Sequence, residues 1–327
     1  MRMPANSPLS GRVGPPPNEP ARTASRTLAR VVAAGALTGA AGIGYAVLEA
    51  RAYTLRRWEM PVLPAGSRPL KVLHLSDMHM TPSQGSKQRW VASLAGLEPD
   101  LVVNTGDSLA HMRSVPTVLD ALGRLLDVPG VFVLGSNDYF APTLRNPARY
   151  LLRDDGRRNV HAPELPWREL RDAFAGAGWL DLDNRRGALD VGGLRLAFAG
   201  VDDPHLEYDD LAAVAGPADP DADLRVGVAH APYLRVLDAF ARDGYDAVFA
   251  GHTHGGQLCL PGKGALVTNC DLETARAKGL HRHPAGSAAD EPGSSWLHVS
   301  AGLGTSPFAP VRFACRPEAS LVTLTPR

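Results

Sequence analysis

Short apolar runs alternate with amphipathic stretches and glycine-rich turns along most of the chain, from Leu70 to the C-terminus. The runs have the length and composition of buried β-strands. We predict strands at residues 70–74, 101–104, 131–134, 194–199, 225–229, 247–250, 296–300 and 321–324. Apolar residues at three- and four-residue spacing predict helices at residues 87–97, 117–126, 167–177 and 233–242. Strands that alternate with helices are typical of an α/β fold, which we assign to residues 70–327. A Pro-, Gly- and Ser-rich stretch at 282–295 is predicted as a surface loop.

The residues before this domain show two other patterns. Residues 1–27 are rich in Pro, Ser, Asn and Arg and have no apolar periodicity, so we predict a disordered tail. No charged residue occurs between Arg30 and Glu49, and this interval is close to the minimum length that spans a bilayer. We therefore predict a transmembrane anchor at residues 28–50, followed by a juxtamembrane linker at 51–69.

Two other interpretations of the apolar segment stay open, a cleaved signal peptide and a buried helix rich in Ala and Gly. An anchor would make this a single-pass membrane protein. Its orientation is not selected by charge, because three arginines on one side are balanced by three on the other. These are Arg22, Arg26 and Arg30 before the segment and Arg51, Arg56 and Arg57 after it.

Composition and charge exclude some partners. Hydrophobic residues make up 44% of the 327 residues, which is enough for a sizeable core. The 34 Lys and Arg residues equal the 34 Asp and Glu residues, so no overall positive field indicates a nucleic-acid partner. No feature of the sequence predicts a protein partner. The three cysteines, Cys259, Cys270 and Cys315, are odd in number and widely spaced, which favours buried thiols over a disulfide framework.

Five of the predicted strands end in the same way, with small residues followed at once by side chains that bind metals. Residues at the carboxyl ends of strands in an open α/β sheet converge on one crevice, although they lie far apart in the sequence. A single His or Asp at such a position is commonly a hydrogen-bonded turn residue, so the joint pattern carries the prediction. The side chains are those of Asp77, His79, Asp107, Asn137, His230, His252 and His254.

Two carboxylates, four imidazoles and one amide form a mixed nitrogen and oxygen ligand set. Such a set suits Mn, Zn, Fe or Co better than Ca or Mg, and it contains no thiolate of a structural zinc site. Seven ligands exceed what one ion needs, whereas two divalent ions that share a carboxylate would use them all. Asp107 is the natural bridge. Two such ions would make the crevice locally positive and attractive to a phosphate oxyanion.

The order and spacing of these motifs resemble those of the calcineurin-like metallophosphoesterase family, whose signature is D-x-H, G-D, G-N-H-[DE], a lone H and G-H-x-H. The resemblance extends from about Leu70 to the C-terminus. The sequences G-H-T-H-G-G-Q and S-A-G-L-G-T-S-P are similar to the membrane-associated bacterial phosphodiesterase branch of this family. The fold that the resemblance implies is a four-layer α/β/β/α sandwich, with two mixed β-sheets flanked by helices.

The resemblance also implies roles for individual residues. Asp77, His79 and His254 would bind one ion. His230 and His252 would bind the second ion together with an amide side chain, and Asp107 would bridge both. In the usual mechanism of the family, a hydroxide that bridges the ions attacks phosphorus in line.

One motif departs from the family pattern. Where the family has Gly-Asn-His-Asp, this chain has Gly135-Ser136-Asn137-Asp138. An amide oxygen is a better metal ligand than a neutral hydroxyl, so we assign the second-metal position to Asn137, with Ser136 as the alternative. The usual catalytic His is then missing.

A proton for the leaving group could come from His205 or from His111, unless both are ordinary loop residues. Gly255 and Gly256 would let the backbone approach a substrate closely, or they simply form a tight strand connection.

The sequence thus predicts an enzyme that hydrolyses a phosphodiester, a phosphomonoester or a pyrophosphate. An anchor favours a lipid-linked substrate, because tethering raises the effective concentration of enzyme at the bilayer. One alternative is a membrane-tethered binding or scaffold protein that has lost catalysis, for which the altered G-S-N-D turn is the best support. Another is a nuclease, which the absence of a basic tract disfavours.

Overall fold

A computed structural model of the protein describes residues 19–144, 152, 156, 158, 160–289 and 291–327. The chain divides into two compact units, residues 1–44 and 45–327. Helix α1 (Glu19–Glu49) extends from the first unit into the second. The predicted disordered tail at 1–27 lies mostly outside the described residues, and its last part, residues 19–27, is helical instead.

Within α1, the segment Val32–Glu49 is long and apolar enough to cross a membrane by length and composition, with a mean hydropathy of 1.3. Only 11% of this segment is buried, whereas the core helix that we considered as an alternative would be mostly buried. The segment overlaps the anchor predicted at residues 28–50.

The second unit is built around two six-stranded mixed sheets. The first sheet has the strand order β1 (Thr54–Leu63), β14 (Glu318–Pro326), β2 (Leu70–Leu75), β3 (Leu101–Asn104), β4 (Gly130–Phe132) and β5 (Leu180–Asp181). The second has the order β12 (Gly279–His283), β13 (Ser295–Val299), β9 (Ala247–Ala250), β8 (Leu224–Ala229), β7 (Leu194–Gly200) and β6 (Arg185–Val191). Strands β10 (Cys259–Leu260) and β11 (Gly264–Ala265) form a separate hairpin.

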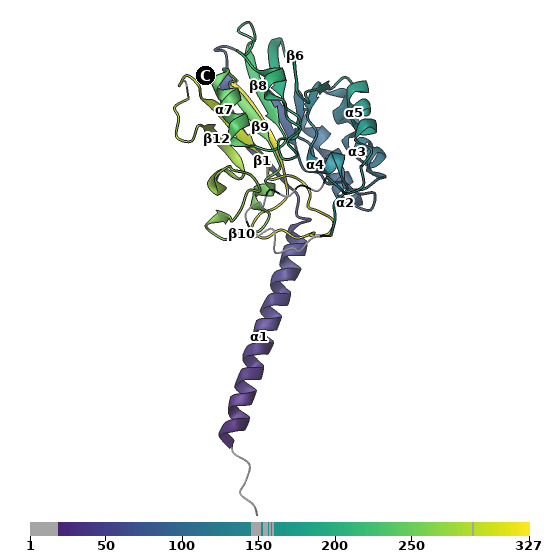
Figure 1. Ribbon diagram of the computed structural model, residues 1–327, viewed down its shortest axis with the longest axis vertical. Helices are drawn as coiled ribbons and strands as arrows, with labels where there is room; N and C mark the ends of the chain where they lie inside the picture. Colours follow the sequence, from purple (N-terminus) through teal and green to yellow (C-terminus); the bar gives the residue numbers. More distant parts are fainter. Residues whose placement is uncertain (1–18, 145–151, 153–155, 157, 159, 290) are drawn as a thin grey trace, which may run out of the picture. The chain divides into compact units, whose positions relative to one another are not determined.

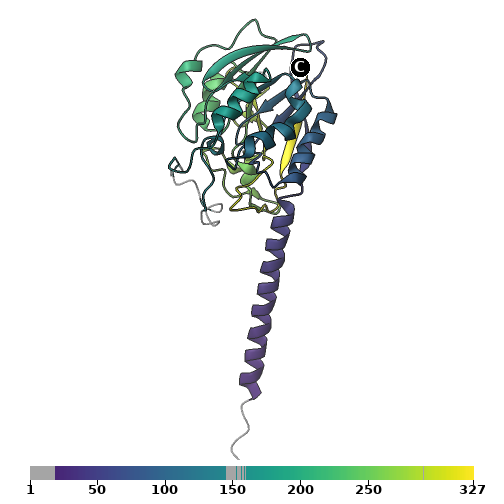
Figure 2. The same ribbon diagram turned by 90° about the vertical axis from the view of Figure 1, so that its right-hand side faces the viewer.

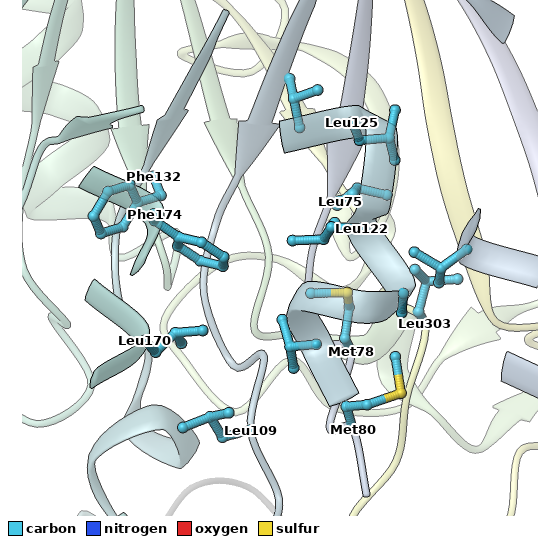
Figure 3. Close-up of a cluster of buried hydrophobic side chains, with 14 of the residues drawn as sticks. Leu75, Met78, Met80, Leu109, Leu122, Leu125, Phe132, Leu170, Phe174 and Leu303 are labelled. Carbon is cyan, nitrogen blue, oxygen red and sulfur yellow. The ribbon is translucent and has the colours of Figure 1, made fainter. Parts of the chain in front are cut away.

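Three apolar interfaces join four layers, which confirms the predicted sandwich. The first interface packs β2, β3 and β4 against the helices α2 (Gly85–Ser93), α3 (Ser114–Leu122) and α5 (Trp167–Gly176). Figure 3 shows this cluster, with Leu122 and Phe174 facing Leu75 and Phe132. The second interface lies between the two sheets. The third packs the outer face of the second sheet against α6 (Leu211–Val214) and α7 (Leu234–Arg242), and α7 lies over β8 and β9 in Figure 1.

The period-two alternation of strand side chains explains how one strand serves two interfaces. In β2, Leu73 and Leu75 pack against the helices, whereas Leu70 and Val72 pack between the sheets. His74 also lies on the inner face, where it is fully buried.

Strand β1 corrects the linker predicted at residues 51–69. Its ten residues pair in parallel with β14, and Met60 and Leu63 are fully buried. Figure 2 shows the yellow strand β14 beside the dark N-terminal strands. The prediction failed because β1 is an edge strand that contains charged residues and Pro61, both of which are tolerated at edges and resemble a linker in sequence.

All eight predicted strands and all four predicted helices correspond to observed elements, with ends shifted by a few residues. The short strands β5, β10 and β11 and the exposed strand β6 were not predicted. Strand β12 also includes the first two residues of the loop predicted at 282–295. Strands β2, β3 and β4 run parallel to one another, as do β7, β8, β9 and β13. Their carboxyl ends therefore lie at a common edge of each sheet.

Candidate metal centre

The side chains at these strand ends converge as the sequence predicts. Ligand atoms of Asp77, His79, Asp107 and His254 all lie within 4.8 Å of one another. Asp77 and His79 follow β2, Asp107 follows β3, and His254 follows β9. Three of these residues thus come from the first sheet and one from the second, so the group exists only because the two sheets pack together.

The first group is arranged around a buried carboxylate oxygen. His79 Nε2 lies 3.2 Å from His254 Nε2 and 3.4 Å from Asp107 Oδ2. His254 Nε2 lies 3.5 Å from Asp77 Oδ1. Asp77 Oδ1 is buried and accepts no hydrogen bond from the described part of the chain. A buried carboxylate oxygen beside two imidazole nitrogens fits a divalent cation, which would supply the missing partner.

A second group adjoins the first through Asp107. The other oxygen of this carboxylate, Oδ1, lies 3.6 Å from His230 Nε2. His230 Nε2 in turn lies 3.3 Å from His252 Nδ1. Asp107 therefore stands between the two groups and faces each with a different oxygen, as a bridging carboxylate would.

Backbone carbonyls fix the orientation of both rings in the second group. A carbonyl oxygen only accepts hydrogen bonds, so His230 Nδ1, 2.7 Å from Thr105 O, must donate. His252 Nε2 must likewise donate to Asn269 O at 3.2 Å. If both rings were neutral, the facing nitrogens His230 Nε2 and His252 Nδ1 would both hold lone pairs, so a proton or a metal ion must lie between them. Carbonyl partners of this kind are usual for metal-binding histidines.

The electrostatics of the centre also favour a cation. Burial alone would lower the pKa of His230, but the carboxylates of Asp107, Asp203 and Asp77 outweigh it and raise the pKa to about 9. Burial lowers the pKa of His79 to about 4, although Asp107 opposes this shift. The local charge is thus negative enough to hold a proton on one imidazole, and divalent ions would compensate it more completely.

Strained backbone brings the side chains together. Asp77, His79, Asp107, His252 and His254 all have positive φ, between 41° and 67°. For residues other than glycine this conformation is uncommon and costs roughly 1–3 kcal/mol each. Five such residues in one cluster indicate that the turns are shaped by the site and not by local preference.

Two glycines leave the space that the ligand side chains occupy. A Cβ on Gly135 would stand 2.4 Å from Asp107 Oδ1, and one on Gly251 would stand 1.9 Å from Ser76 Oγ. Both contacts are far inside van der Waals range, so any larger residue at either position would displace the centre.

The Gly135-Ser136-Asn137-Asp138 turn begins α4 (Ser136–Tyr139) and touches Asp107 directly. Asn137 donates from its backbone N–H to Asp107 Oδ1 and from its side-chain amide to Asp107 Oδ2, both at 2.7 Å. Asp138 accepts from the backbone N–H of Ser108 and Leu109 and so joins this turn to the one after β3. The turn therefore positions Asp107, and the assignment of Asn137 or Ser136 as a metal ligand stays a prediction.

Of the two predicted proton donors, His205 lies beside the centre. Its ring centroid is 4.4 Å from that of His252, and its Nδ1 lies 3.2 Å from Tyr233 Oη. His111 lies on the surface, where its Nδ1 accepts from the N–H of Arg113.

The glycines predicted to contact substrate are both buried. A Cβ on Gly255 would stand 2.8 Å from Ala301 Cβ, and one on Gly256 would stand 2.4 Å from Ala265 Cβ. On that side, both glycines face the protein itself, as the tight strand connection that we considered requires. Their contact with substrate stays a prediction.

A chain of buried hydrogen bonds behind Asp77 was not predicted. Ser76 Oγ donates to Asp77 Oδ2 at 2.5 Å, and Thr105 Oγ1 donates to Ser76 Oγ at 2.7 Å. The Thr105 proton is thereby committed, so His74 Nε2, 3.0 Å away, must donate to Thr105 Oγ1. His74 Nδ1 must then accept from His298 Nδ1 at 2.8 Å. Every donor points toward Asp77 Oδ2, which leaves Oδ1 for a cation.

Two buried cations also lie next to the centre. Lys87 Nζ donates to Met78 O at 2.6 Å, and burial lowers the pKa of this amine to about 7. The guanidinium of Arg312, which has no exposed surface, donates to Ala301 O and Gly304 O, both at 2.7 Å. Neither residue belongs to a ligand motif, so no sequence signal predicts its place beside the centre.

The hydroxyls of Ser76 and Thr105 do have a local signal in the sequence, because each stands one or two residues before a predicted ligand.

This fold and this arrangement of Asp and His residues define a metallophosphoesterase-like centre, and comparison with known proteins agrees. Residues 70–256, more than half of the chain, match the family model for calcineurin-like phosphoesterase. The chain therefore belongs to the calcineurin-like phosphoesterase family, which confirms the resemblance drawn from its motifs.

Similar proteins include uncharacterized and membrane proteins. The uncharacterized protein YpbG of Bacillus subtilis (strain 168) is 26% identical over 79% of this chain and 82% of that protein. The uncharacterized metallophosphoesterase YkuE of the same organism is 24% identical over 90% of this chain and 93% of that protein. A Bos taurus protein named transmembrane protein with metallophosphoesterase domain is 29% identical over 61% of this chain, which spans 44% of its length. A crystal structure of TT1561 of Thermus thermophilus covers 72% of this chain and 91% of its own, with a TM-score of 0.40 and 13% identity.

Proposed function

We propose that this protein is a metal-dependent phosphoester hydrolase that uses two divalent ions, Mn, Zn, Fe or Co. The observation that carries the proposal is the pair His230 Nε2 and His252 Nδ1, which lie 3.3 Å apart beside Asp107, while the other nitrogen of each ring lies against a backbone carbonyl. This pair would hold one ion. The group of Asp77, His79 and His254 would hold the other, with Asp107 shared between the two and Asn137 completing the second set.

When bound, two such ions supply a water activated near neutral pH and Lewis-acid stabilisation of the phosphoryl oxygens. The residues of the chain orient the side chains that would bind the ions. Asp107 keeps both oxygens directed at the two groups because Asn137 donates to each of them. Thr105 O and Asn269 O keep the rings of His230 and His252 in one orientation, so the rings need not turn when ions bind.

We further propose that His205 protonates the departing oxygen of the substrate. Its ring packs against His252, and its Nδ1 lies 3.2 Å from the Tyr233 hydroxyl, so the imidazole lies beside the group of His230 and His252. A histidine is suited to this role because its ordinary pKa lies near neutral pH.

The substrate that we propose is a phosphodiester, a phosphomonoester or a pyrophosphate, linked to a lipid. The segment Val32–Glu49 would anchor the enzyme by a single pass, and the bovine relative that is named a transmembrane protein supports such an arrangement. Balanced arginines on its two flanks select neither side of the membrane.

The proposal is tested by metal content and turnover of the full-length protein. After loading with Mn or Zn, we expect close to two ions per chain, together with hydrolysis of bis(4-nitrophenyl) phosphate. Asp107→Asn should reduce kcat/KM by roughly 100–1,000-fold, on the scale of losing one strong electrostatic contact at a reaction centre. Asp127→Asn, on the exposed surface, is the matched control.

Two outcomes would contradict the proposal in different ways. If the loaded protein contains no bound ions, the proposed metal centre does not exist. Two bound ions without turnover of any phosphoester would favour the alternative of a catalytically impaired scaffold protein, for which the Ser136 and Asn137 replacements are the supporting observation.

A further inference from the structure

The end of helix α1 and the candidate metal centre lie at the same edge of the first sheet. Helix α1 ends at Glu49, and strand β1 begins at Thr54, which pairs with Glu318 in β14. The N–H of Glu318 donates to Gly302 O at 2.9 Å. A Cβ on Gly302 would stand 2.6 Å from Asp77 Cβ. A short series of neighbouring residues therefore connects the end of the apolar helix to the centre.

The last turn of α1 is held by the segment before β14. Ala46 O accepts from the N–H of Arg312 at 3.0 Å, and Glu49 Oε2 accepts from the N–H of Ala314 at 2.9 Å. All four residues belong to the unit 45–327, so this turn is fixed to the sandwich. Arg312 also supports the metal-site loop through Gly304 O.

The hairpin β10–β11 packs against the same segment. Phe313 donates from its N–H to Gln257 O at 3.0 Å and accepts from Cys259 N–H at 2.8 Å. On its other side, the Phe313 ring meets Tyr45 of the last turn of α1, with centroids 5.3 Å apart. In Figure 1, β10 lies at the same end of the sandwich as the yellow loops that precede β14.

Large apolar side chains are exposed on the elements around this segment. They are Leu48 (70% exposed), Leu260 (45%), Leu266 (38%) and Phe308 (46%), and we call them the apolar rim. Single exposed apolar residues are normal. These residues differ because each stands on the last turn of α1, on the hairpin or beside it, or on the loop that precedes Arg312. Lys263, at the tip of the hairpin, is exposed as well and suits an anionic headgroup.

We propose that the apolar rim contacts the surface of the lipid bilayer, so that the edge of the sandwich holding the metal centre faces the headgroups. The inference rests on the proposed anchor, because the rim surrounds the point where the apolar helix ends. Leucine and phenylalanine side chains near a membrane enter the boundary between headgroups and acyl chains. The contact would orient the enzyme in a way that the anchor alone does not impose.

The depth of the rim can be measured in the full-length protein. Phe308→Trp places a fluorophore in the rim, and Arg124→Trp places one at an exposed position just before β4, at the opposite edge of the sheet. Each variant is reconstituted into vesicles of phosphatidylethanolamine and phosphatidylglycerol with brominated acyl chains, which quench nearby indoles. The fluorescence added by Phe308→Trp should fall roughly twofold or more, because the rim reaches the acyl boundary. The fluorescence added by Arg124→Trp should not fall.

A double variant, Leu260→Asp with Phe308→Asp, tests the consequence of the contact, with Arg124→Asp as the matched control. Hydrolysis of a phosphodiester embedded in the vesicles should fall at least roughly tenfold in the double variant, because charged residues are excluded from the boundary. Hydrolysis of soluble bis(4-nitrophenyl) phosphate should be unchanged in both variants, since neither position belongs to the metal centre.

Each contrary result has its own meaning. Equal quenching at positions 308 and 124, in protein that floats with the vesicles, would contradict the contact of the apolar rim with the bilayer but not the membrane anchor. Full-length protein that does not float with the vesicles would contradict the anchor, and therefore also the contact of the rim with the bilayer. A dimer that Phe308→Asp dissociates would show that a second copy of the chain covers the rim instead. Absence of turnover on both substrates would contradict the proposed activity, while the quenching result would still decide the rim.

Discussion

Individual residues behind the metal centre determine how its carboxylates are presented. The hydrogen bonds that run from His298 to Asp77 Oδ2 all point one way, and the N–H of His252 donates to the same oxygen at 3.0 Å. Asp77 Oδ2 is therefore saturated, and only Oδ1 is available to an ion. Outer partners of this kind commonly matter almost as much as the ligands themselves.

Thr105→Val should weaken metal binding by roughly 10–100-fold, the usual effect of removing an outer partner. Valine keeps the shape of threonine but cannot donate to Ser76, so Ser76 loses the bond that orients its own hydroxyl toward Asp77. Thr105→Ser restores the hydroxyl and should rescue most of the loss. Competition with a metal-sensitive dye measures the affinity, and an unchanged affinity in Thr105→Val would show that the chain of hydrogen bonds is only structural.

His205 and Asn137 should differ in their kinetic effects. If His205 is the general acid, His205→Gln should slow hydrolysis of alkyl esters by roughly 100–10,000-fold and affect nitrophenyl esters little, because their leaving groups need no proton. Asn137→Ala should instead weaken binding of the second ion, and added metal should restore much of the rate.

Rates measured for both ester types across a metal titration separate the two roles. Full metal occupancy in Asn137→Ala, combined with a defect that depends on the leaving group, would move the acid role from His205 to Asn137. The two side chains can be tested separately because Asn137 touches Asp107, whereas His205 touches His252.

Among the elements, strand β1 decides where the folded domain begins. Met60, Val62 and Leu63 are buried between the sheets. Burial of a large apolar side chain contributes roughly 1.5–3 kcal/mol, so these three together approach the whole stability of a typical domain. Removal of β1 would also leave the edge of β14 unpaired and prone to aggregation.

A chain that begins at Tyr45 should therefore be soluble and folded, whereas one that begins at Leu70 should aggregate or lose its cooperative thermal transition. Far-UV circular dichroism during heating and size-exclusion chromatography compare the two. A monomeric, cooperatively unfolding chain from Leu70 would show that β1 is dispensable, and residues 51–69 would then act as the linker that the sequence suggests.

At the scale of the whole molecule, two buried histidines between the sheets make the free energy of unfolding depend on pH. Burial lowers the pKa of His298 to about 3, and burial together with the neighbouring His298 lowers the pKa of His74 as well. In the unfolded chain these rings have a pKa near 6.5, so they become protonated below that pH. In the folded chain they stay neutral at the same pH. The free energy of unfolding is therefore unaffected by these two histidines above about pH 6.5 and decreases as the pH falls from there toward 3.

Each such histidine should add roughly 1.4 kcal/mol per pH unit to the loss of unfolding free energy below pH 6.5. His298→Asn keeps a donor for His74 but does not titrate, so urea unfolding between pH 6.5 and 4.5 should show a shallower dependence on pH. The control is His161→Asn, at an exposed position, which should show the same pH dependence of the unfolding free energy as the parent protein. An equal slope in His298→Asn would mean that this ring is charged in the folded protein.

Local patterns along the chain were enough to predict the α/β class and the family, and to select six Asp and His residues whose side chains the structure brings together. These features can be predicted because an apolar run, a tight turn and a ligand residue follow one another within a few positions. Strand β1 could not be predicted in this way, since its charged edge and Pro61 look like a linker until β14 pairs with it.

The presentation of those residues, in contrast, depends on tertiary contacts. The ring orientation of His230 depends on Thr105 O, 125 positions away in the chain, and the orientation of Asp77 depends on His298 across the gap between the sheets. Such contacts have no local signature, because they arise from the packing of two sheets whose strands are distant in sequence. The same packing placed the end of the apolar helix at the same edge of the first sheet as the metal centre, through a register of β1 on β14 that no pattern in either strand specifies.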